Sequence, residues 1–178
     1  MAMKSSNHLW SSTGTPYVLV LLRIAYGLLW LQQTTWKVPP DFGMRSGGGL
    51  YYWTNEMTKY SFLPLHRSFV EFVVLPHFLL FAWLTLFTEL FIGISHLLGL
   101  VTRLGALVAL AMSTNLLIGL ARQPSVWPWS YLMLLGYALI FLGTHPGRVL
   151  GLDGLLSRHL SASALAGRRW AILLSLLT

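Results

Sequence analysis

Two ionisable residues, Arg23 and Glu89, stand inside long apolar stretches of this 178-residue chain. A charge within hydrocarbon is costly, so each needs a partner, and such residues commonly mark functional sites. We expect the two to pair, because neighbouring antiparallel helices would bring them to similar depth at 1.5 Å per residue. A carboxylate in that setting can relay a proton, and a guanidinium can orient a bound group. Glu89 and Arg23 are therefore the candidate catalytic residues.

Both residues belong to stripes at helical spacing. Gly27, Trp30 and Thr34 follow Arg23 on one face, and Thr85, Ile92 and His96 flank Glu89 on another. Facing stripes of this kind could line a pocket for a quinone ring. The candidate cofactor-binding residues are Arg23, Trp30, Glu89 and His96. A buried ion pair that only fixes helix register explains the same pattern, and the sequence leaves both interpretations open.

A second cluster of cations is predicted near the membrane surface, among aromatic residues. Lys37, His66 and Arg67 could draw in a small anion and form a substrate-binding site. Membrane-belt residues with snorkelling side chains are the more common explanation of such a cluster. No metal-ligand spacing occurs, and the chain has no cysteine. His96 and His145 both fall near inner ends of spans, where two haem ligands could face each other, but surface or capping histidines are the more common explanation. We expect no haem, metal or iron–sulfur cluster in this chain.

The composition indicates whether these residues lie in water or in a membrane. Hydrophobic residues make up 55% of the chain and charged residues 10%, which leaves too little polar surface for a soluble domain. The net charge of +7 is scattered among apolar segments, so anionic lipid headgroups or an acidic partner subunit fit it better than nucleic acid does. The chain is predicted to be an integral membrane protein.

The predicted fold is an all-α integral membrane protein, a bundle of four transmembrane helices. Each apolar stretch is near the length that crosses about 30 Å of hydrocarbon. The expected divisions are a polar N-terminal tail (1–16), a transmembrane domain (17–150) with spans at about 17–36, 72–100, 104–120 and 127–144, and a C-terminal interfacial tail (151–178). The long first loop, 37–71, has room for a site and is expected to carry an interfacial helix at about 50–60.

Orientation is predicted from the basic residues of the loops. The bias between the two sides is small, and the arginines near the C-terminus tip it towards the inside. We expect both termini on the inner side and the long first loop outside.

Several runs resemble a known family. They are Leu22-Arg-Ile-Ala-Tyr-Gly-Leu-Leu-Trp-Leu-Gln32, Trp36-Lys-Val-Pro-Pro-Asp-Phe-Gly43, Thr88-Glu-Leu-Phe-Ile-Gly93, Leu98-Gly-Leu-Val-Thr-Arg-Leu-Gly105, Trp127-Pro-Trp-Ser-Tyr131 and Gly147-Arg-Val-Leu-Gly-Leu-Asp153. In this order and spacing the chain resembles the DoxX-like membrane proteins of the DoxD type, from about Leu19 to Asp153. The polar positions that recur in the family are matched by Arg23, Lys37, Glu89 and Arg103.

The resemblance implies a small membrane subunit of a thiosulfate:quinone oxidoreductase of the prokaryotic plasma membrane. Thiosulfate is oxidised there to tetrathionate, electrons pass to quinone, and a second subunit, DoxA, is the usual partner. On this interpretation Lys37 and Arg67 attract the sulfur anion, and without thiols the electrons pass directly or through a partner.

Two other interpretations compete with an enzyme. The chain could be a non-catalytic accessory subunit packed against a larger respiratory or photosynthetic complex, since it is small and has no self-contained cofactor site. A transporter or channel has less support, because no inverted repeat is evident. A catalytic subunit should keep an open, ligand-sized cavity beside its buried charges, whereas an accessory subunit should close that space.

Overall fold

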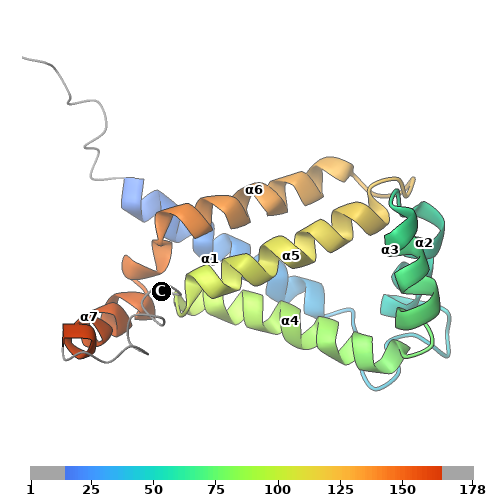
Figure 1. Ribbon diagram of the computed structural model, residues 1–178, viewed down its shortest axis with the longest axis horizontal. Coiled ribbons are helices and arrows are strands. Elements are labelled where there is room, and N and C mark those ends of the chain that lie inside the picture. The colour runs from blue at the N-terminus through green and yellow to red at the C-terminus, as the bar shows by residue number, and fades with distance from the viewer. Residues whose placement is uncertain (1–14, 166–178) are drawn as a thin grey trace, which may run out of the picture.

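The computed structural model describes residues 15–165, and every regular element in that range is a helix (Figure 1). Most of the predicted N-terminal tail and the end of the predicted C-terminal tail lie outside the described residues. The elements are α1 (Thr15–Thr34), α2 (Gly49–Tyr60), α3 (Pro64–Phe69), the π-helical turn η1 (Val70–Val74), α4 (Phe78–Leu98), α5 (Thr102–Leu120), α6 (Pro128–Thr144), the 3₁₀ turn η2 (Pro146–Arg148) and α7 (Leu152–Leu165). The predicted all-α class is confirmed.

Among the described helices, α4 and α5 are long and apolar enough to cross a membrane by length and composition, and α6 is a shorter apolar helix. The apolar stretch predicted as one span at 72–100 is interrupted. Pro76 cannot continue a helix, because it lacks an N–H and its ring collides with the carbonyl four residues earlier. The backbone of His77 is accordingly non-helical, with φ −113° and ψ 32°, and α4 begins at Phe78.

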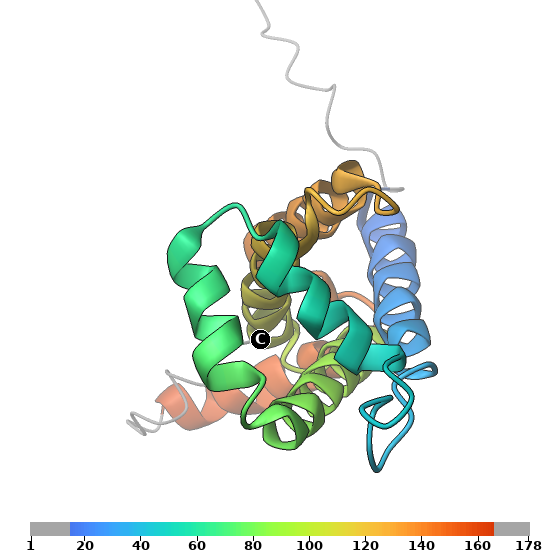
Figure 2. The same ribbon diagram turned by 90° about the vertical axis from the view of Figure 1, so that its right-hand side faces the viewer.

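The long helices form an incomplete ring. α1 packs along α4, α4 contacts α5, and α5 packs along α6. α1 and α6 lie close together at the end near α7 and diverge towards the other end, where α2 and α3 lie across the opening (Figures 1 and 2). The bundle therefore has a narrow end and a wide end.

Glycines set the distance between α1 and α4. A Cβ atom on Gly27 would lie 2.8 Å from the backbone nitrogen of Leu97 and 2.9 Å from the carbonyl oxygen of Gly93. Both neighbours are backbone atoms, which cannot rotate away as side-chain atoms can. This contact fixes which residues of α1 face which residues of α4.

We expect Gly27→Ala to destabilise the protein by about 1–3 kcal/mol, the usual penalty for overpacking. The matched control is Gly136→Ala in α6, where nothing lies within 4 Å of the added methyl group. There the change should be neutral or stabilising by up to about 1 kcal/mol, because alanine has the higher helix propensity. Thermal unfolding in a mild detergent compares them, and equal stability of the two variants would contradict the close contact.

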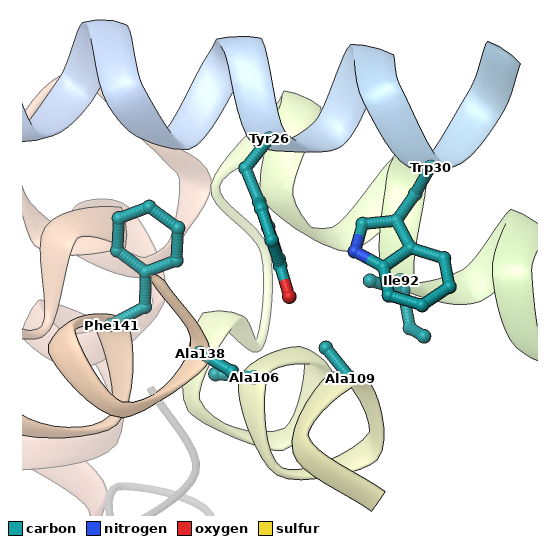
Figure 3. Close-up of a cluster of buried hydrophobic side chains, with 7 residues drawn as sticks. All are labelled: Tyr26, Trp30, Ile92, Ala106, Ala109, Ala138 and Phe141. Carbon is teal, nitrogen blue, oxygen red and sulfur yellow. The ribbon is translucent and has the colours of Figure 1, made fainter. Parts of the chain in front are cut away.

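The largest buried cluster joins α1 to the other three long helices (Figure 3). The Tyr26 and Trp30 side chains enter from α1, and alanines on α5 and α6 leave space for them. The Tyr26 hydroxyl donates a hydrogen bond to the carbonyl of Leu134 at 3.1 Å, and its ring meets Phe141 edge-on at 5.4 Å between centroids. Tyr26 therefore connects α1 to α6 where the two helices begin to diverge.

Candidate functional site

A cavity of about 1120 Å³ fills the wide end of the bundle. Side chains of α1, α2, α4, α5 and α6 line it, and four tryptophans contribute: Trp30, Trp36, Trp53 and Trp129. Ligand pockets in proteins measure about 300–1,000 Å³ and are mostly apolar with a few polar groups. This space can therefore hold an aromatic molecule of moderate size.

A buried ion pair forms part of the cavity wall. The Lys37 ammonium lies 2.7 Å from Oε2 of Glu89, with the two side chains only 3% and 4% exposed. The same ammonium donates to the carbonyl of Gln33 at 2.7 Å and lies 3.9 Å from the ring centroid of Trp36. Lys37 follows the end of α1, and its side chain turns back along the last helical turn. A cation and a carboxylate are thus held side by side at an apolar cavity.

The predicted ion pair of Arg23 with Glu89 is wrong. Because α1 and α4 are antiparallel and Gly27 lies beside Gly93 and Leu97, Arg23 one turn earlier reaches the C-terminal end of α4, next to Gly99. Arg23 is 1% exposed, and its guanidinium donates to the carbonyls of Pro146 (3.0 Å) and Leu150 (3.1 Å). Arg23 lies at the narrow end and does not line the cavity.

His96 also lies away from the cavity. Its ring is fully buried between Tyr26 and Phe141, at 5.0 and 5.4 Å between centroids, and Nδ1 bonds the carbonyl of Ile92 at 2.8 Å. Of the four residues predicted to bind a quinone, the cavity brings together Trp30 and Glu89. Arg23 and His96 lie beyond it towards the narrow end.

The three residues of the predicted anion site have separate partners. Lys37 is bound to Glu89, and Arg67 donates to the carbonyl of Lys59 at 3.0 Å. The ring nitrogens of His66 lie 2.9 Å from Ser61 Oγ and 3.0 Å from Asn115 Oδ1. Asn115 itself lines the cavity. His66 therefore holds a cavity-wall amide in place, and Lys37 belongs to the cavity.

The helix α2 covers the wide end. Its apolar residues Leu50, Trp53 and Met57 line the cavity, so this face points inward. The sequence predicts instead that the same face lies on the membrane surface. Glu56 fastens the helix: Gln123 Nε2 donates to its Oε2 at 3.4 Å, and Lys59 lies 2.7 Å from its Oε1. The hydrogen bond from Lys59 lowers the pKa of the Glu56 carboxyl, which keeps the carboxylate charged.

Asp153 is a residue whose importance the sequence analysis missed. Its fully buried carboxylate accepts from the backbone nitrogens of Val101 (2.6 Å) and Thr102 (2.9 Å) and from the Thr102 hydroxyl. Arg23 donates hydrogen bonds to carbonyls of the turn just before Asp153. These contacts hold the start of the predicted interfacial tail against the narrow end of the bundle. The run Gly147 to Asp153 carried the signal, an isolated acid within a glycine-rich turn.

Comparison with known proteins gives one match. A family model described as "TQO small subunit DoxD" matches residues 18–177. No curated protein and no solved structure matches the chain. The resemblance predicted from the sequence runs is confirmed.

Proposed function

Because the chain belongs to the DoxD family, we propose that it is a membrane-embedded redox subunit that passes electrons from thiosulfate to a quinone. The observation that carries the proposal is the cavity with the Lys37–Glu89 pair in its wall. An accessory subunit would have no need of a ligand-sized cavity beside its buried charges. The open space therefore favours the redox subunit.

The cavity residues fit a quinone ring. Such a ring needs flat apolar surfaces and hydrogen-bond donors for its two carbonyl oxygens, and tryptophan side chains supply the surfaces. Lys37 supplies one donor. Asn115 supplies another, because its Oδ1 bonds His66 and leaves the amide NH₂ to donate into the cavity.

The ion pair gives the site its chemistry. Oxidation of two thiosulfates to tetrathionate releases two electrons, and a quinone that accepts them takes up two protons to become a quinol. Lys37 would orient a carbonyl oxygen and favour negative charge on it. Glu89 would hold a proton next to that oxygen and deliver it. Electrons would come directly from the sulfur anion or through a partner subunit.

We further propose that α1, α4, α5 and α6 all span a prokaryotic plasma membrane, with α2 and α3 on the outer side and the N-terminus inside. Tryptophans near the wide end, including Trp36, Trp127 and Trp129, would then lie at the outer interface, where this residue is enriched. Thiosulfate would approach from outside past His66 and Arg67 on α3. The family is that of a small subunit, which supports assembly with partner subunits.

The test is thiosulfate-dependent quinone reduction by protein purified from native membranes in mild detergent, with its co-purifying chains identified by mass spectrometry. We expect Glu89→Gln to lower the turnover number by about 10²–10⁴-fold, the usual contribution of a positioned acid or base. The control is Glu71→Gln, the same change at an exposed glutamate of η1. The proposal fails if the wild-type assembly shows no such reduction, or if the chain co-purifies as an inactive subunit of a large complex.

A further inference from the structure

The cavity has a side opening as well as a covered end. Its lining includes residues from the second half of α1 and the first half of α6, the parts of these helices that diverge (Figures 1 and 2). α1 packs mainly on α4, and α6 mainly on α5, so no helix of the described chain lies between them. α4 and α5 also diverge towards the wide end, but of the neighbouring long helices in the described chain α1 and α6 are packed least against each other (Figure 1).

The side chains at the edges of this gap belong to the cavity wall and to the outer surface together. Leu29 is 47% exposed, Trp36 37%, Trp129 56% and Met133 46%, and all four line the cavity. These exposed side chains mark the edge of the cavity on α1 and α6, where the two helices diverge (Figure 1). The opening is bounded towards the narrow end by Tyr26, whose hydroxyl bonds the backbone of α6.

The surface onto which the gap opens is mostly apolar, with Gln33 and Ser130 as its polar residues. Leu28 and Leu132, the neighbours of Leu29 and Met133, are 52% and 57% exposed. None of the cavity-lining residues of α1 and α6 is charged. Contact of such a surface with water is unfavourable, whereas contact with a hydrocarbon chain carries no such cost. The ion pair lies inside the same cavity, so a polar site and an apolar exit form one continuous space.

We propose that the gap between α1 and α6 is a lateral entrance for an isoprenoid quinone, which exchanges directly with the bilayer. The ring lies in the cavity beside Lys37 and Glu89, and the isoprenoid tail leaves between Leu29 and Met133. This inference rests on the proposed function, since it takes the ligand to be a quinone. It adds the route and the part of the ligand that the gap recognises.

The experiment uses the full assembly and two photoreactive quinones, one with the reactive group on the ring and one with it on the tail. Labelled peptides are identified by mass spectrometry. We expect the ring probe to label cavity residues such as Trp53 and the tail probe to label the edges of the gap. Ring labelling in the cavity combined with tail labelling on α2 or α3 would overturn the lateral entrance and leave the proposed function standing. No ring labelling in the cavity would overturn both.

A matched pair of variants tests the same route kinetically. Met133→Trp narrows the gap and should raise KM for a long-tailed quinone at least ten times more than KM for a tail-less benzoquinone. Leu139→Trp adds the same bulk to the exposed surface of α6 outside the cavity and should leave this ratio unchanged. Equal ratios in the two variants would contradict an entrance between α1 and α6.

Discussion

Replacing Lys37 by methionine is expected to destabilise the folded protein by about 3–5 kcal/mol, because the change leaves the Glu89 carboxylate buried without its cation. The free energy of unfolding in mild detergent measures the effect. Lys59→Met is the control, since Lys59 also pairs with a glutamate at 2.7 Å but its side chain is 63% exposed. The partner Glu56 is 7% exposed but keeps its hydrogen bond from Gln123, and only the mostly solvated cation is lost, so the control should lose less stability than Lys37→Met.

The double variant Lys37→Met with Glu89→Leu is expected to recover most of that loss. Two apolar side chains of similar volume need no desolvation of charge, and such replacements of buried ion pairs are often neutral or stabilising. The double-mutant cycle then gives a large coupling energy between the two positions. Additive single effects would mean that the 2.7 Å pair contributes nothing as a pair.

The double variant also separates folding from function. If the pair only fixes helix register, a stable double variant will keep the activity of the wild type. We expect the reverse: a folded protein that assembles normally but has lost quinone reduction, because neither a donor nor a proton carrier remains at that wall of the cavity. Retained quinone reduction in the double variant would show that the Lys37–Glu89 pair has only a structural role.

The sequence was sufficient to predict that Glu89 is buried and needs a cation, but it identified the wrong one. Hydrophobic runs predict where the membrane-spanning helices lie. They do not predict which residues of one helix lie beside which residues of the next. That register depends on the close contact of Gly27 with Gly93, which moves Arg23 to the end of α4. Lys37 follows the helix in sequence, and only the backward turn of its side chain brings it to Glu89.

The helix α2 shows a similar limit. Its periodicity correctly indicates an apolar face with Leu50, Trp53 and Met57, and such a face can be covered by lipid or by other helices. The choice depends on whether α1 and α6 diverge, which is a property of four helices packed together. The cavity and its lateral gap could not have been predicted from any single segment for the same reason.

Replacing Asp153 by alanine is expected to destabilise the narrow end by about 3–5 kcal/mol, the second large effect in this chain. The carboxylate satisfies two backbone nitrogens at the start of α5, where no residue of α5's own N-terminus provides a side-chain cap. It also lies close enough to interact with the charge of Arg23. Its loss leaves buried donors unsatisfied and removes a negative charge that favours the buried Arg23 cation.

Asparagine should not rescue this position. It has the size of aspartate but presents one acceptor oxygen, and its NH₂ group would face a backbone nitrogen that itself donates. The control Asp41→Asn concerns a carboxylate with one long hydrogen bond, 3.3 Å from the backbone nitrogen of Arg45, and should change stability little. Unfolding in mild detergent compares the two variants, and equal stability would contradict the buried cap.

The location of the structural change in the Asp153 variants distinguishes a local loss of stability from global unfolding. Hydrogen exchange in the Asp153 variants should accelerate at the start of α5, where the backbone nitrogens of Val101 and Thr102 lose their acceptor. It should also accelerate in η2, whose Gly147 lies against Thr102, and at the start of α7, where the replaced side chain stands. Exchange in α2 should stay as in the wild type, since α2 covers the opposite end of the bundle (Figure 1). The molecules that remain folded should therefore bind a quinone with unchanged affinity. Weakened binding by them would show that the two ends of the bundle are coupled, and that Arg23 and Asp153 act on the cavity from the far end.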